Sequence, residues 1–125
     1  MSTPVVYEAP RGIGIAGLEA AILDAFHKLR DAVESGRAAI VIVRDSDLLG
    51  HGEPADAALA NGLLGLVRAF ATERRREQWV VNMLAVEEGT DAAARRAWVE
   101  RLADPQGIVG ALIRVGPTHL GRVQV

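Results

Sequence analysis

The chain has 125 residues, a net charge of −2 and no cysteine, which suits one domain with a buried core. The charge balance excludes a basic nucleic-acid footprint, and the lack of cysteine excludes disulfides, thiolate metal sites and a cysteine nucleophile. No apolar run approaches the ~20 residues that cross a bilayer, and residues 1–12 carry no signal-like apolar stretch. We therefore expect a cytoplasmic protein that binds neither nucleic acid nor membrane.

The first third of the chain predicts a strand, a helix and a second strand. Val5-Val6-Tyr7 is a short apolar run typical of a strand. From about Ile15 the apolar side chains recur at helical spacing through about residue 35, and Gly36 supplies a C-terminal stop. Residues 39–43 form a continuous β-branched run without alternation, which is the pattern of a central strand in a parallel sheet.

The rest of the chain continues this alternation. Residues 44–54 predict a loop, and Pro54 begins a helix that extends to about Arg76. We then expect a strand over 79–86, a helix over 90–102, a strand over 111–115 and a short edge strand between 119 and 125. The order predicts a single α/β domain over residues 1–125, a truncated Rossmann-like fold in three layers. Its mostly parallel sheet has about four strands, helices on both faces and right-handed crossovers.

A glycine-rich segment joins the first strand to the first helix. Gly12, Gly14 and Gly17 match G-x-G-x-x-G, a pattern that lets a backbone approach a pyrophosphate at a helix N-terminus. Asp45, at the end of the next strand, is the candidate acid for a nucleotide ribose, although its spacing is longer than the usual ~20 residues. The other interpretation is a glycine-rich turn that only starts the helix.

The helix over residues 57–71 is apolar on nearly every side, interrupted only by Asn61 and Arg68. A helix of this kind must be buried on more than one face. One of its stripes consists of small residues: Ala58, Gly62, Gly65 and Ala69. We predict that this stripe meets a helix of another subunit; the alternative is that helix 15–35 of the same chain covers it.

Acidic residues gather around the loop over residues 44–54. They are Asp45, Asp47, Glu53 and Asp56. Turn formation and helix capping explain them, and an acid–base pair or a hard-cation site is the alternative. The three histidines are isolated in sequence, so we predict no metal site.

The segment from residue 57 to 73 ends in Gly-Leu-Val-Arg-Ala-Phe-Ala-Thr-Glu. It resembles the active-site helix of the short-chain dehydrogenase/reductase family, in which Tyr-x-x-x-Lys is followed by Gly-Leu-x-Arg-Ala-x-Ala-x-Glu. On that alignment the tyrosine position falls on Asp56 and the lysine position on Ala60. Val80-Val81-Asn82 and the run from Gly107 to Gly116 resemble the family's next strand and its closing segment.

The resemblance covers residues 14–116 and implies the C-terminal half of such an enzyme, most like the degenerate N-terminal domain of high-molecular-weight ketoacyl reductases. It also implies that the three βα units that hold the adenosine half of the dinucleotide are missing. The catalytic serine position falls near Arg44, with Ser46 as a displaced remnant. Asp56 is a poor proton donor at neutral pH and Ala60 carries no charge, so we predict no catalytic residue.

These observations support two hypotheses and a third, less specific one. The first is a cofactor-free pseudoenzyme, an assembly module that forms a homo-oligomer, or a hetero-oligomer with a complete reductase subunit, through helices 15–35 and 55–76. The second is an oxidoreductase component that binds NAD or NADP through its glycine-rich segment and shares a site with a partner. Against the second, Glu8 stands where the family's loop has its first glycine and would repel phosphate. The third is a small-molecule pocket lined by the loop over residues 44–54.

Overall fold

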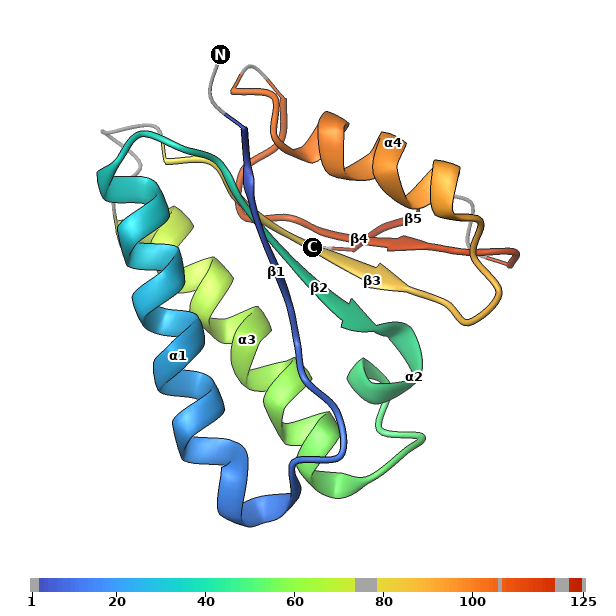
Figure 1. Cartoon of the computed structure of the whole chain (residues 1–125). Helices are drawn as coiled ribbons and strands as arrows, with labels where there is room; N and C mark the ends of the chain where they lie inside the picture. The colour runs from blue at the N-terminus through green and yellow to red at the C-terminus, as the bar shows by residue number, and fades with distance from the viewer. Residues whose placement is uncertain (1–2, 74–78, 106, 119–121, 125) are drawn as a thin grey trace.

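The computed structural model describes residues 3–73, 79–105, 107–118 and 122–124, which form a five-stranded sheet flanked by helices (Figure 1). The strands lie in the order β1-β2-β3-β4-β5, the first four parallel and β5 antiparallel to β4. Their bounds are Val5–Glu8, Ala39–Arg44, Val81–Val86, Leu112–Val115 and Arg122–Gln124. The predicted edge strand near the C-terminus is therefore confirmed as β5.

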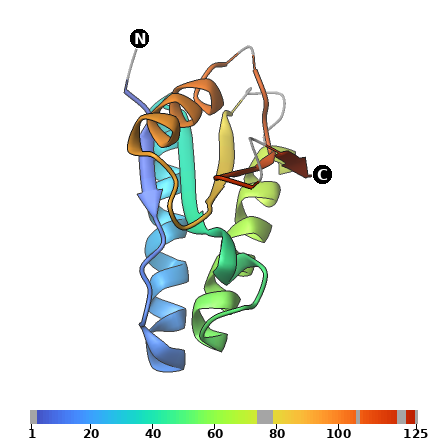
Figure 2. The same ribbon diagram turned by 90° about the vertical axis from the view of Figure 1, so that its right-hand side faces the viewer.

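The helices lie on both faces of the sheet, so the predicted three-layer α/β architecture is confirmed. α1 (Gly14–Glu34) and α3 (Pro54–Glu73) pack side by side on one face and run in the same direction (Figure 1 and Figure 2). α4 (Ala92–Leu102) covers the other face. The segment predicted as a loop over 44–54 contains a short helix, α2 (Asp45–Leu48). Among the described helices, none combines the length and apolarity needed to cross a membrane.

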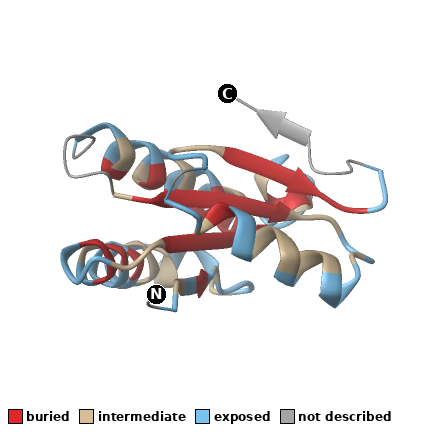
Figure 3. Ribbon diagram, turned by 90° about the horizontal axis from the view of Figure 1, so that it is seen from above, coloured by how far each residue is buried: buried red, intermediate tan, exposed pale blue. Residues whose placement is uncertain are grey.

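The two faces of the sheet have separate cores because side chains alternate along each strand. Val41, Met83 and Leu112 point toward α1 and α3, where Leu29, Leu63 and Val67 complete a buried cluster. Ile40, Leu84 and Ile113 point the other way and pack against Leu102 of α4. β2 and β3 are therefore buried along most of their length (Figure 3), which explains their continuous apolar runs.

The hand of the crossovers differs from the prediction. Each step from β1 to β4 moves to the next strand in the same direction across the sheet, so the face on which the connecting helix lies sets the hand of the crossover. Because α4 lies on the opposite face from α1 and α3, its crossover has the opposite hand. The prediction of right-handed crossovers throughout is wrong, because the second apolar face of the sheet needs a helix and α4 supplies it.

Candidate functional site

The carboxyl ends of the parallel strands bring four loops together, and ligands of open α/β sheets bind at this edge. Residues 9–13, which include Gly12, follow β1; α2 follows β2, Glu87 follows β3 and Gly116 follows β4. The region that the resemblance aligns with the active site of the reductase family lies between the start of α3, α2 and the β1–α1 loop. Asp45, Asp47 and Asp56 in and near this region each pair with another group of the chain.

Asp56, which the resemblance aligns with the family's tyrosine, is a buried hydrogen-bond acceptor. Only 5% of Asp56 is exposed, and its Oδ1 accepts a hydrogen bond of 2.9 Å from the backbone N–H of Gly12. The carboxylate thereby ties the first turn of α3 to the β1–α1 loop. Ala60, at the lysine position, is buried among the apolar side chains of the α1–α3 core. Neither position presents a group to a substrate.

A second pair joins the β1–α1 loop to α2. Arg11 Nε lies 2.7 Å from Asp47 Oδ2, and Arg11 Nη2 lies 3.1 Å from Asp47 Oδ1. This hydrogen bonding to Asp47 raises the pKa of Arg11 above its ordinary value. Asn61 of α3 donates to the carbonyl of Leu48 at 3.1 Å, which fixes α2 against α3. Ser46, the candidate remnant of the catalytic serine, is half-buried in α2.

Asp45 and Arg114 form a buried ion pair that spans β3. Arg114 Nε and Nη2 lie 2.7 and 2.9 Å from the two carboxylate oxygens of Asp45. The register places Arg114 beside Ala85 of β3, a small residue over which the long arginine side chain reaches β2. The hydrogen bonds to Asp45 raise the pKa of Arg114. Asp45, the candidate ribose acid, therefore turns toward β4 and away from the glycine loop after β1.

Sequence reasoning missed both arginines of these pairs. A signal for Arg114 was present: a charged residue in the middle of an apolar strand requires a buried partner of opposite charge. Arg11 carried no such signal, because it lies in a polar loop. Nor did the sequence indicate that Glu8 pairs with Arg95 of α4. Among the described residues, no group of three His, Cys, Asp or Glu side chains is arranged to hold a metal ion.

Two of the three glycines of the G-x-G-x-x-G segment have positive φ angles. Gly12 and Gly14 have φ angles of 72° and 68°, a conformation that favours glycine. Gly17 lies within α1, where a Cβ would come 3.1 Å from the Cβ of Ile13. Gly12 and Gly14 are exposed, whereas Ala9 and Ile13 of the same loop are half-buried and pack against the core under α1 and α3. These glycines thus meet the needs of a tight strand-to-helix turn, and the backbone of Gly14 stays open to solvent.

The outer face of α1 and α3 carries exposed apolar and small side chains. Ala58, Gly62, Gly65 and Ala69 are all exposed. A Cβ at Gly62 would lie 3.6 Å from Ile22 of α1, whereas one at Gly65 would meet no atom within 4 Å. α1 therefore borders the small-residue stripe but leaves most of it uncovered.

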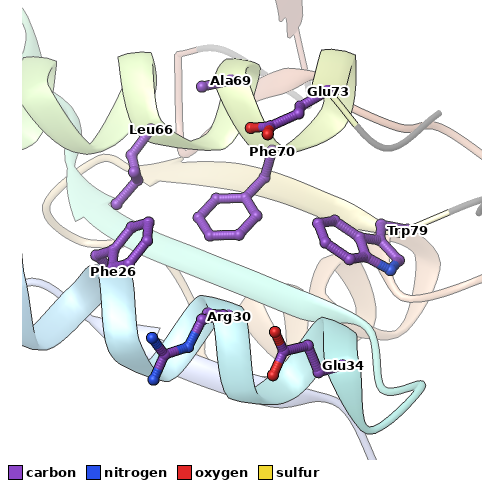
Figure 4. A pocket seen from close by; sticks show the side chains of 8 residues that line it. All are labelled: Phe26, Arg30, Glu34, Leu66, Ala69, Phe70, Glu73 and Trp79. Carbon is purple, nitrogen blue, oxygen red and sulfur yellow. The ribbon is translucent and has the colours of Figure 1, made fainter.

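A groove of about 190 Å³ opens between α1 and α3 on this face (Figure 4). The ring of Phe70 lies between those of Phe26 and Trp79, with centroids 5.7 and 5.9 Å away. Arg30 and Glu34 of α1 and Glu73 of α3 form its charged border. Because the helices run opposite to the strands, this groove lies at the far end of the sheet from the loop over residues 44–54.

A solved structure described as a short chain dehydrogenase from Mycobacterium avium is similar to this chain, with a TM-score of 0.57 and 20% sequence identity. The likeness covers 87% of this chain but only 43% of that structure, so the chain spans less than half the length of its structural neighbour. No protein-family model and no curated protein sequence matches the chain. The predicted Rossmann-like α/β fold is thus confirmed, and it is similar to part of a solved short chain dehydrogenase.

Proposed function

We propose that this chain is a non-catalytic, short-chain-dehydrogenase-like assembly module that pairs through the outer face of α1 and α3. The observation that carries the proposal is the surroundings of Asp56 and Ala60, which the resemblance aligns with the family's tyrosine and lysine. Asp56 is committed to the Gly12 backbone and Ala60 is packed in the core. These two positions therefore supply neither a proton donor nor a cation for the ribose. The reductase mechanism needs both groups.

The surface of α1 and α3 supports association. Ile15, Leu23 and Phe26 of α1 are 80%, 51% and 37% exposed, and the small-residue stripe of α3 lies beside them. Apolar surface of this kind on a soluble domain marks a protein contact. Glycine and alanine on a helix surface let a second helix approach closely.

A second copy of the chain is the simplest partner, because a twofold axis places the same face on both sides of the interface. A complete reductase subunit that presents an equivalent pair of helices is the other partner that we propose. Measuring the mass of the purified chain alone, and then with such a subunit, distinguishes the two arrangements.

The test is the oligomer mass of Gly65→Leu, measured by light scattering across a range of concentrations. A side chain at Gly65 meets open space within the chain, so the variant should fold while blocking close helix approach. Ala93→Leu, at an exposed site on α4, is the matched control and should keep the wild-type mass. An unchanged mass for Gly65→Leu would contradict the proposal.

The second candidate is an oxidoreductase component that binds NAD or NADP through Gly12, Gly14 and Gly17, together with a partner. The positive φ angles of Gly12 and Gly14 at a strand–helix junction favour it. The contact of Asp56 argues against this candidate, because its carboxylate already accepts the hydrogen bond of the Gly12 N–H that a phosphate would need. Titration with NADH and NADPH, followed by nucleotide fluorescence, decides between the candidates. Saturable binding that is lost in Gly14→Val would support the second.

A further inference from the structure

The groove between the C-terminal halves of α1 and α3 is a preformed apolar socket. Phe70 forms its floor with only 8% of its surface exposed, while Phe26 and Trp79 flank it. Figure 4 shows these rings lying between the two helices, with Arg30 and Glu34 along one border. A hollow lined by aromatic rings is stabilised by an apolar occupant, since water there makes few hydrogen bonds.

The opposite end of the same helix pair carries an apolar knob. Ile15, in the first turn of α1, has 80% of its surface exposed, the highest among the exposed large apolar side chains of the described residues. Residues 15, 22, 26 and 30 share one face of α1 because they follow helical spacing. The knob and the socket therefore lie on the same outer face of the chain.

Ile15 and the groove lie at equal distances, in opposite directions, from one point along the axes of α1 and α3. Ile15 and Arg30 lie about 11 Å on either side of the level of Ile22 and Leu23, at 1.5 Å per residue. Gly62 lies beside Ile22, and the small-residue stripe of α3 is centred between Gly62 and Gly65. The midpoint of the stripe thus falls within about one residue of the midpoint between knob and socket.

We infer that in a self-paired dimer the Ile15 side chain of each subunit inserts into the Phe26–Phe70–Trp79 groove of the other. This inference rests on the proposed function and names its partner as a second copy of the chain. A twofold axis through the stripe makes the helices antiparallel across the interface and forms two such contacts. Glu19, one turn after Ile15, then falls level with Phe26 of the other copy. The guanidinium carbon of Arg30 lies 5.9 Å from the centroid of that ring, so that opposite charges meet beside the groove.

Disulfide cross-linking tests the inference directly, because the chain has no cysteine of its own. A tagged Ile15→Cys chain is co-expressed with an untagged Ala69→Cys chain; Ala69 lines the groove and is exposed. Mild oxidation should give mainly the mixed-size covalent dimer. Two copies of Ile15→Cys should cross-link poorly, because their cysteines would lie about 22 Å apart along the helix axis, beyond the ~7 Å Cα separation that a disulfide spans.

A second cysteine pair separates this inference from the proposed function. Ala58→Cys co-expressed with Ala69→Cys should cross-link whenever the stripes of two copies pack antiparallel. Cross-linking of 58 to 69 without 15 to 69 would overturn the inference and leave the proposed pairing standing. Dominant 15-to-15 cross-linking would also overturn it. A monomeric mass with no cross-link in either pair would contradict both the inference and the proposed function.

A non-covalent readout completes the test. Ile15→Asp should raise the dimer dissociation constant at least tenfold, since it would place a carboxylate against aromatic rings. Ile108→Asp, at a site 41% exposed in the loop before β4, is the matched control and should leave the constant unchanged. Equal dissociation constants for Ile15→Asp and wild type, with native circular dichroism, would contradict the inference.

Discussion

The carboxylate of Asp56 accepts a 2.9 Å hydrogen bond from the backbone N–H of Gly12, a residue 44 positions earlier in the chain. This contact joins two features that the sequence analysis treated separately, the lost tyrosine position and the glycine loop. The residue that the resemblance aligns with the family's tyrosine holds the loop between β1 and α1. The contact therefore gives Asp56 a structural role.

Replacing Asp56 with alanine should destabilise the chain by about 1–3 kcal/mol, because the hydrogen bond between its carboxylate and the Gly12 N–H is lost. Asp56→Asn should lose less, since its amide oxygen can still accept. Urea unfolding measures both free energies. Glu53→Ala removes an exposed carboxylate from the residue that precedes α3 and should have little effect; equal losses for Asp56→Ala and Glu53→Ala would contradict the prediction.

The Asp45–Arg114 pair should show strong coupling between its two partners. Asp45→Leu and Arg114→Met should each destabilise the chain by about 3 kcal/mol, because each removes one member of a buried, hydrogen-bonded ion pair. The double variant should recover much of this loss, as apolar side chains can fill the site. A double-mutant cycle by urea unfolding checks the result, and additive losses would contradict it.

Two glycines should respond in opposite ways to the addition of one methyl group. A Cβ at Gly116 would overlap the side chain of Glu87, so Gly116→Ala should destabilise the chain by about 1–3 kcal/mol. Gly65 lies in a helix with open space around its Cα, and Gly65→Ala should stabilise the monomer by about 0.5–1 kcal/mol. Thermal unfolding at low concentration compares the two. A Gly116→Ala chain as stable as wild type would show that Glu87 moves aside without cost.

The stability of the chain should fall at alkaline pH because of Tyr7. Burial, and then the charge of Asp24, raise the pKa of this phenol above its ordinary value. The folded state thus holds the phenolic proton more tightly than the unfolded state, so the stabilisation is complete below about pH 10. It is lost as the pH rises from there through the folded pKa. Tyr7 is the only tyrosine, so its ultraviolet absorbance reports the titration directly.

Tyr7→Phe is the matched variant for this pH effect. It keeps the ring in the core but has no titrating group, so its stability should change less above about pH 10 than that of wild type. Urea unfolding at several pH values gives the comparison. Parallel pH profiles for the two chains would show that another group causes the alkaline loss.

The sequence by itself predicted the elements and their order, because these depend on local patterns. The β-branched run at residues 39–43 predicted β2, the helical spacing from Ile15 predicted α1, and Pro54 marked the start of α3. The resemblance over residues 14–116 agrees with a structural likeness that covers 87% of the chain. The short α2 was missed because its four residues look like any polar turn.

Only the tertiary structure decided the hand of the α4 crossover and the partners of the polar side chains. Both sheet faces are apolar, so the pattern of β2 and β3 could not say which face α4 would cover. The pairs of Asp56 with Gly12, Asp47 with Arg11 and Asp45 with Arg114 join residues 36 to 69 positions apart. Such pairing depends on strand register and on space above small residues such as Ala85. These are properties of the packed sheet, and no local stretch of sequence contains them.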